Sequence, residues 1–250
     1  MKLSDIACSA AIAASTLLAA QPASAGEPRA VIELFTSQGC SSCPPADKLA
    51  GEFARDPSLI VMSLAVDYWD YLGWKDTLAL HGHSNREHAY ANARGDREVY
   101  TPQAVINGLV AVVGNDKSAI EDAIAQTRKN AAPLSLPVTL RVADGKVTAD
   151  VADAKAGSGD QRSGEVWLCP ITGKISVNIE RGENKGHTLS YYNVVRRWVK
   201  LGDWAGKAQS FSISESDVAN AEIDSYAVLV QGGGVTKPGL VLGAASVAAH

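Results

Sequence analysis

Cys40 and Cys43 are the residues whose type and spacing most clearly suggest chemistry. Two serines separate them, and the pair lies between a compact apolar segment and a helix-like segment. Cysteines at this spacing at the start of a helix can close a small disulfide, and the positive end of the helix dipole favours a thiolate on the first, exposed sulfur. We therefore expect Cys40 to attack and Cys43 to resolve mixed disulfides by thiol exchange.

Two other interpretations of the cysteine pair stay open. One is a purely structural disulfide, and the other is a pair of ligands of a metal. A metal would need further ligands, and the histidines closest in sequence are His81, His83 and His88. A dithiol with loop histidines is a weak pattern for zinc or copper, so we assign neither a metal nor another cofactor.

The segments around the pair predict alternating strands and helices. Compact apolar runs suit strands that are covered on both faces, and the periodic segments suit helices. Asn107-Gly108 between two apolar runs is typical of a two-residue hairpin. The expected order is β-α-β-α-β-β-α, with elements at residues 29–35, 44–55, 59–66, 84–93, 103–106, 109–113 and 116–130.

The second half of the chain contains only strand-like segments. It begins after a break in composition at Ala131-Ala132-Pro133, and Asp144-Gly145 marks another hairpin. Seven or eight short strands at this spacing indicate a small β-sandwich. The strands are expected at residues 138–143, 146–151, 165–172, 174–181, 188–201, 209–214, 226–231 and 240–247.

With a strand, a Cys-x-x-Cys pair, a helix and then Thr101-Pro102 ahead of a hairpin, the chain resembles the thioredoxin superfamily. The resemblance implies that Pro102 is a cis proline facing the dithiol, with Thr101 beside a substrate groove, and an X–Pro bond adopts cis at modest cost. The chain departs from the superfamily at Pro44-Pro45. These prolines remove two N–H donors near the thiolate and bias Cys43 away from helical angles.

Segments 33–45, 66–74, 99–103 and 182–186 look closer still to a family of secreted bacterial proteins described only as a domain of unknown function, DUF 1223. This resemblance covers nearly the whole mature chain. The expected fold is an α/β thioredoxin-like domain followed by a smaller all-β sandwich-like domain. We place a signal peptide at 1–25, the thioredoxin-like domain at 27–131 and the β-sandwich-like domain at 134–250.

Three further side chains are candidates for the site. Glu33 stands alone among apolar residues, near where thioredoxins keep a buried acid that assists proton transfer at the resolving cysteine. The alternative is a strand-end carboxylate that reaches solvent or a local partner. Trp69 and Trp74 lie in an aromatic, acidic loop. These rings either form a wall of the substrate groove or pack beneath the loop as part of its core. Cys169, in an apolar strand, is expected to be a free buried thiol.

The first 25 residues predict export. Lys2 precedes an apolar stretch that is too short to span a bilayer comfortably, and Ala23-Ser24-Ala25 suits the cleaving peptidase, so the mature chain should begin at Gly26. The alternative is a retained membrane anchor. We expect a periplasmic or secreted protein without a stable membrane anchor.

The charge balance argues against a polyanion partner. The net charge is −4 and no basic stripe is present, so we expect no binding to nucleic acid. The predicted function is thiol–disulfide exchange with protein or small-molecule thiols and disulfides, with an envelope redox partner. The alternatives are a binding module for a metal or a protein, in which the dithiol is merely oxidised, and a structural envelope protein.

Overall fold

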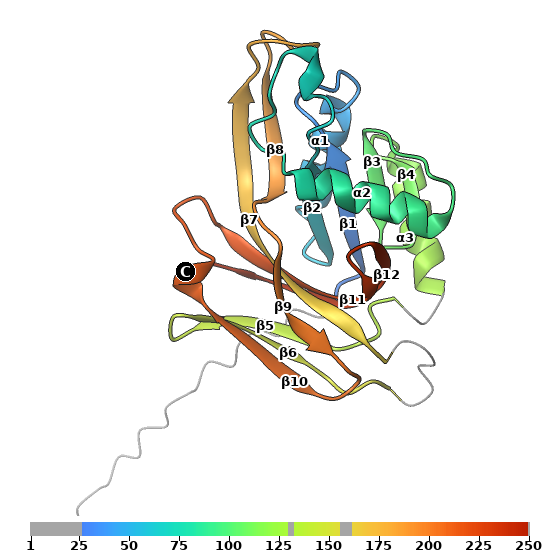
Figure 1. The fold of residues 1–250 in the computed structure, drawn as a ribbon, viewed down its shortest axis with the longest axis vertical. Coiled ribbons are helices and arrows are strands. Elements are labelled where there is room, and N and C mark those ends of the chain that lie inside the picture. Colours follow the sequence, from blue (N-terminus) through green and yellow to red (C-terminus); the bar gives the residue numbers. More distant parts are fainter. Residues whose placement is uncertain (1–26, 130–132, 156–161, 250) are drawn as a thin grey trace, which may run out of the picture.

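The computed structural model describes residues 27–129, 133–155 and 162–249. The expected signal peptide and most of the composition break before Pro133 therefore lie outside the described residues. Within the described ranges the chain forms twelve β-strands, three α-helices and two short 3-10 helices (Figure 1). None of the described helices is both long and apolar enough to cross a membrane.

The first half of the chain forms its elements close to the expected segments. They are β1 (Ala30–Thr36), α1 (Pro44–Phe53), β2 (Leu59–Ala65), α2 (His81–Arg94), β3 (Gln103–Ile106), β4 (Val110–Val113) and α3 (Lys117–Lys129). Local backbone chemistry sets their ends. Asn107 and Gly108 have φ angles of 52° and 73°, which only a few residue types adopt readily, and they form the turn between β3 and β4. The carboxylate of Asp116 accepts a hydrogen bond from the N–H of Ala119 and caps α3.

In the described residues of the second half, the regular elements are strands and one 3-10 turn, and two boundaries differ from expectation. The strands are β5 (Val138–Ala143), β6 (Lys146–Val151), β7 (Gly164–Asn178), β8 (Thr188–Val195), β9 (Val199–Trp204), β10 (Gln209–Ser214), β11 (Ser225–Gly234) and β12 (Lys237–Ala248). Two expected strands merge into β7, because β9 and β11 pair with its first part and β8 pairs with its second part. The expected strand at 188–201 divides into β8 and β9.

The predicted fold class is wrong. One mixed sheet of nine strands, in the order β12-β11-β7-β8-β2-β1-β3-β4 with β9 paired to β7, runs through both halves of the chain. The junction is the parallel pair β2–β8, in which Ser63 lies opposite Val194 and the Ser63 hydroxyl donates to the carbonyl of Tyr192 at 2.7 Å. A thioredoxin-like α/β core with a separate small β domain would leave β2 as an unpaired edge, and here β8 covers that edge.

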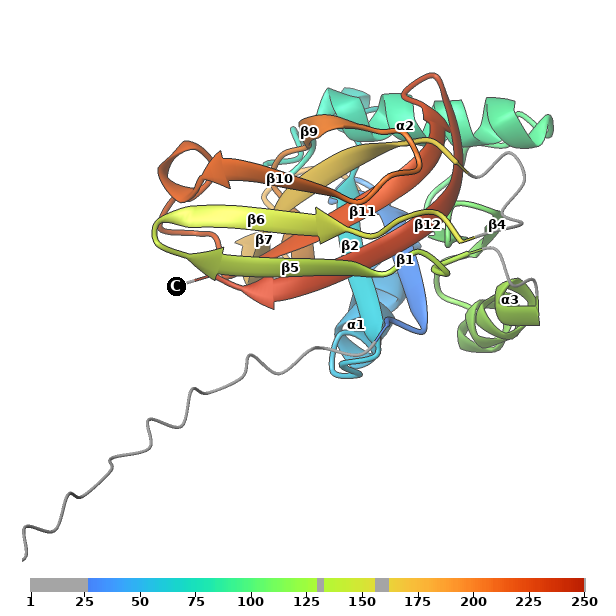
Figure 2. The same ribbon diagram turned by 90° about the horizontal axis from the view of Figure 1, so that it is seen from below.

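Two layers cover the large sheet in different places. Ile32 and Leu34 of β1 pack with α1 and α3 on one face, whereas Val31 and Phe35 pack with Tyr90 of α2 on the other face. Strands β5, β6 and β10 form a second, three-stranded sheet that packs against β7, β11 and β12 (Figures 1 and 2). The two halves of the chain therefore share their packing as well as their hydrogen bonds.

Helix α1 illustrates this sharing, because it lies against β8 as well as β1 and β2. A Cβ atom at Gly51 of α1 would come within 2.6 Å of the ring of Tyr192 in β8. The absence of a side chain at Gly51 thus permits the close approach of a helix from the first half to a strand from the second half. The position of α1 decides the position of the cysteine pair at its start.

Candidate functional site around the cysteine pair

Cys40 and Cys43 form a disulfide between the end of β1 and the start of α1, with their Cα atoms 5.4 Å apart. Cys43 occupies the N-cap position of α1, and Pro44 and Pro45 follow in the first turn, where missing N–H groups cost least. Cys43 has φ −79° and ψ −34°, so the expected bias away from helical angles is wrong at this residue. The N–H of Cys43 donates to the carbonyl of Cys40 at 3.2 Å, which holds the turn in this conformation.

The predicted groove residue Thr101 lies directly against the disulfide. The carbonyl oxygen of Thr101 is 3.7 Å from Sγ of Cys40, a contact without a proton because neither sulfur of a disulfide carries hydrogen. The bond from Thr101 to Pro102 is cis. Trp69 donates its indole N–H to the hydroxyl of Thr101 at 2.8 Å. The structure therefore brings Thr101 and Trp69 together beside the cysteine pair.

The aromatic loop holds the other side of the cysteine turn. Trp74 donates its indole N–H to Oε1 of Gln38 at 2.8 Å. Tyr71 stacks on Trp69 with the ring planes 17° apart and is 77% exposed. A Cβ atom at Gly39 would lie 2.9 Å from Cβ of Trp69, so glycine permits this close contact. The loop thus supports the turn and also presents an exposed aromatic ring beside it.

A loop from the second half of the chain closes over the cysteine turn. The side-chain amide of Asn184 donates to the carbonyls of Gln38 and Cys40, both at 2.9 Å. Glu183 accepts a hydrogen bond from the N–H of Ser41 at 3.2 Å. Cys40 and Cys43 are only 1% and 0% exposed. The expectation of an exposed first sulfur is therefore not met in this conformation.

Asp47 is a buried acid one helical turn after Cys43, and the sequence reasoning missed it. Its Oδ1 accepts a hydrogen bond from the hydroxyl of Thr36 at 2.7 Å, while Oδ2 has no partner among the described residues. Burial raises the pKa of Asp47 to about 8, the Thr36 hydrogen bond lowers it and the nearby Asp76 carboxylate raises it further. A signal did exist in the sequence, since Asp47 interrupts an otherwise apolar helix face four residues after Cys43.

Two further buried polar groups lie close to Asp47. Asp76 accepts hydrogen bonds from the N–H groups of Gln38 at 2.7 Å and Leu78 at 2.8 Å, and burial raises its pKa. The Tyr191 hydroxyl is buried and has no partner within the described ranges. Burial, then the charges of Asp47 and Asp76, raise the pKa of Tyr191. Burial thus shifts both side chains toward their neutral forms beside Asp47.

Glu33 is fully buried, but its side chain points to the opposite face of the sheet from α1. It shares the face of Val31 and Phe35, which α2 covers. Arg86 binds the carboxylate through Nε at 2.5 Å and Nη2 at 3.0 Å, and the Tyr90 hydroxyl donates to it at 2.6 Å. The structure therefore places Glu33 with a local ionic partner, while Thr36 and Asp47 occupy the face that carries the cysteine pair.

Cys169, His81 and His83 have surroundings of their own and do not join the pair. Cys169 is a free, buried thiol, as expected, and burial raises its pKa. His81 contacts Asp67 at 2.8 Å, and His83 bonds to the carbonyl of Ala65 at 2.9 Å. Among the described residues, no group of three or more histidines, cysteines or carboxylates is arranged to hold a metal ion.

Comparisons with other proteins give a family but no activity. The family model described as protein of unknown function (DUF1223) matches residues 31–231. The crystal structure of protein AGR_C_4864 from Agrobacterium tumefaciens is 31% identical, with 88% of this chain and 94% of that chain covered and a TM-score of 0.78. HBP35 of Porphyromonas gingivalis shares the fold at 12% identity, with coverage of 88% and 75% and a TM-score of 0.54. No curated protein matches the chain.

Proposed function

The chain belongs to this family of proteins of unknown function, DUF1223, and we propose that it is an exported thiol–disulfide oxidoreductase. It acts on protein or small-molecule disulfides through Cys40 and Cys43. The observation that carries the proposal is the disulfide at the start of α1 with Asp47, a buried and readily protonated acid, in the next turn of the same helix. Acids with strongly shifted pKa values cluster at functional sites, so Asp47 favours an exchanging disulfide over a static cross-link.

The exchange balances as two substitutions at sulfur. A substrate thiolate attacks Sγ of Cys40, a substrate–Cys40 bond forms, and Cys43 leaves as a thiolate that takes up a proton. A second substrate thiolate then attacks the substrate sulfur and releases Cys40. The substrate dithiol has lost two electrons and the protein has gained them. A partner disulfide restores the protein, and the reverse sequence reduces a substrate disulfide.

The surroundings of the pair suit this sequence of steps. Cys40 precedes the N-terminus of the ten-residue helix α1, whose dipole stabilises a thiolate there. Asp47 holds its proton near neutral pH and lies one turn after Cys43, so it is suited to give a proton to the departing Cys43 thiolate and to take it back on reoxidation. This is the role that the sequence suggested for Glu33.

A substrate would approach beside Thr101 and Pro102. Pro102 has no N–H to compete for the thiolate, and the carbonyl of Thr101 already contacts Cys40. Trp69 fixes Thr101, and the exposed ring of Tyr71 extends the wall outward. An extended peptide segment fits such a wall by strand-like pairing. Trp74 supports this wall indirectly, through its bond to the cysteine turn.

Access requires the loop that carries Asn184 to move, because Cys40 is covered in the disulfide form. We place the reaction in the periplasm or outside the cell, since disulfides persist in oxidising compartments and residues 1–25 have the pattern of an export signal. The partners are then thiols and disulfides of secreted proteins or small molecules, together with an envelope redox partner.

One observation favours a second candidate, a static cross-link in a structural envelope protein. Both sulfurs are almost fully buried, as in disulfides that never exchange. The two candidates differ in redox behaviour. A structural disulfide resists reduction by the glutathione pool, whereas a catalytic one has a higher potential.

The test compares single-cysteine variants of the mature protein. Cys43→Ser, incubated with a reduced and reoxidised scrambled ribonuclease, should accumulate a mixed disulfide through Cys40, because the resolving thiol is gone. Cys40→Ser is the matched control and should trap almost nothing. The wild-type protein should also reduce insulin disulfides with glutathione as electron donor. Equal trapping by both variants would overturn the assignment of Cys40 as the attacking thiol and Cys43 as the resolving one. No trapping, together with resistance of the disulfide to glutathione, would establish the structural cross-link instead.

A further inference from the structure

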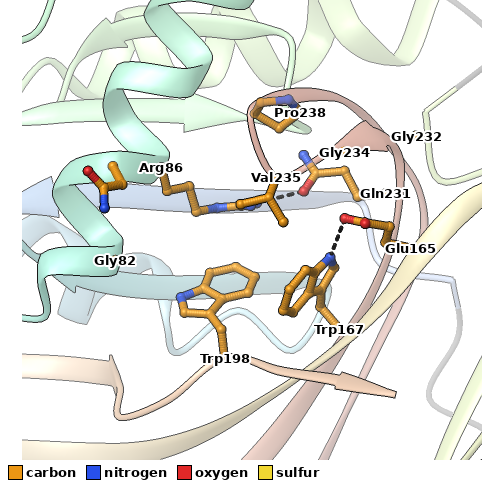
Figure 3. A pocket seen from close by; sticks show the side chains of 11 residues that line it. Gly82, Arg86, Glu165, Trp167, Trp198, Gln231, Gly232, Gly234, Val235 and Pro238 are labelled. Atoms are coloured by element: carbon orange, nitrogen blue, oxygen red, sulfur yellow. Dashed lines mark hydrogen bonds between the residues drawn. The ribbon is translucent and has the colours of Figure 1, made fainter. Parts of the chain in front are cut away.

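A hollow lies away from the cysteine pair, between α2, the first part of β7 and the hairpin that joins β11 to β12 (Figure 3). Its volume is about 200 Å³. None of the residues that surround the disulfide lines it. The lining includes two tryptophans, one arginine, one glutamate and two apolar residues of the hairpin, namely Trp167, Trp198, Arg86, Glu165, Val235 and Pro238.

The walls of the hollow are aromatic. The rings of Trp167 and Trp198 meet edge to face, with centroids 6.2 Å apart and planes at 75°. The guanidinium of Arg86 covers one face of the Trp198 ring at 4.1 Å. Val235 and Pro238 of the hairpin form the rim, and Val235 is 62% exposed. A dry cavity of about 150 Å³ already accepts a benzene ring, so this hollow has room for one substituted ring.

Arg86 supplies a fixed hydrogen-bond donor. Its Nε and Nη2 are held by Glu33, and Nη2 also donates to Gln231 at 2.8 Å and to the Tyr90 hydroxyl at 2.8 Å. The third nitrogen, Nη1, makes no hydrogen bond to the residues that the structure describes, and the side chain is 12% exposed. Since the other two nitrogens are held, the free N–H groups keep their direction and are prepared for an acceptor.

The charges that line the hollow are already balanced. Glu33 neutralises Arg86 in direct contact. Glu165 is paired with Lys200 at 2.8 Å and also accepts the indole N–H of Trp167 at 3.2 Å. A charged ligand would lose its hydration without gaining an unpaired partner, so the site favours an uncharged one.

We propose that this hollow is a binding site for a small, uncharged, planar aromatic compound that carries a carbonyl oxygen. The ring lies against Trp167 and the hairpin rim at Val235 and Pro238, and the carbonyl accepts a hydrogen bond from Nη1 of Arg86. Aromatic walls select the flat ring, and the free Nη1 donor of Arg86 selects the carbonyl. The site does not depend on the redox chemistry proposed for the disulfide.

The test uses benzamide as the probe, with binding followed by saturation-transfer NMR and calorimetry. Toluene lacks the carbonyl, cyclohexanecarboxamide lacks the flat ring, and benzoate and benzylammonium carry charge at nearly the same size. Benzamide should bind at least about fivefold more tightly than each of these compounds, because one net hydrogen bond or ring contact changes the dissociation constant by about that factor. Equal binding of all five compounds, or no binding of benzamide, would overturn the proposal.

Two variants locate the binding. Val235→Phe fills the rim from an exposed position and should abolish benzamide binding without disturbing the buried ionic pair. Val113→Phe, at an exposed valine of β4 outside the hollow, is the matched control and should leave binding unchanged. Binding that survives Val235→Phe would place the compound elsewhere and refute this site. A variant with both Cys40 and Cys43 replaced by serine should bind as the wild type does, which separates this proposal from the redox function.

Discussion

Replacing Asp47 with asparagine should make the stability of the protein less dependent on pH. The asparagine keeps the shape of the protonated acid and the oxygen that accepts from Thr36, but it cannot ionise. Burial raises the pKa of Asp47 from 3.8 in the reference state to about 8 in the folded protein. Between these values the folded protein binds a proton that the unfolded chain has released, so the stabilisation is complete below pH 4 and is lost as the pH rises through 8.

The size of the effect follows from this displacement. One pH unit within the window is worth about 1.4 kcal/mol of unfolding free energy for one proton. From about pH 5.5 to about pH 7.5, the wild type should lose about 3 kcal/mol relative to Asp47→Asn. Other shifted groups titrate in the same range, among them Glu87, whose pKa burial raises to about 7. Groups such as Glu87, which does not interact with Asp47, are common to both proteins and cancel in the difference.

The measurement is urea denaturation of both proteins in the disulfide form at the two pH values, followed by tryptophan fluorescence. Asp122→Asn, at an exposed position of α3, is the matched control and should track the wild type at both pH values. If the difference in unfolding free energy between Asp47→Asn and the wild type is the same at both pH values, Asp47 is already ionised in the folded protein. The proton-transfer role proposed for it would then have no basis.

Three further predictions concern the surroundings of the disulfide and the free cysteine Cys169. Asn184→Ala removes the amide that holds the covering loop, so glutathione should reduce the disulfide several-fold faster in a stopped-flow assay. The control Thr188→Ala, at an exposed residue of the same hairpin, should leave the rate of reduction unchanged. Cys169 should stay unlabelled by iodoacetamide in the folded protein and react after urea unfolding, as read by peptide mass spectrometry, because burial raises its pKa. Trp69→Phe loses the hydrogen bond to Thr101 and should lower the unfolding free energy by about 1 kcal/mol; an unchanged value would mean that this bond contributes nothing.

Features that depend on neighbouring residues could be predicted from the sequence. The hairpin turns at Asn107-Gly108 and Asp144-Gly145 form as expected, because few residue types adopt positive φ angles readily. The position of the disulfide at the end of a buried strand and the start of a helix was likewise visible, since hydrophobic periodicity and the two prolines mark that junction locally. Both features are formed by residues that lie within a few positions of one another, so they do not depend on contacts with distant segments.

The fold class needed the tertiary structure. The sequence shows that β2 and β8 are apolar strands, but strand pairing is made between backbone groups that are the same at every residue. More than a hundred residues separate Ser63 from Val194, and nothing in the sequence predicts that the two residues lie opposite each other in neighbouring strands. The pairing decides that the two halves form one sheet rather than separate domains.

The same physical distinction divides the candidate site. Residue types and spacing alone indicated Cys40 and Cys43. Tertiary packing decided which acid lies beside them, because alternation along β1 directs Glu33 to Arg86 on one face and Thr36 to Asp47 on the other. It also brought Asn184 over the cysteine turn from far along the chain. Reactive groups that are close in sequence can be recognised from the sequence alone. The burial of side chains, the pairing of charges and the access of substrate to the site arise only when distant segments fold against one another.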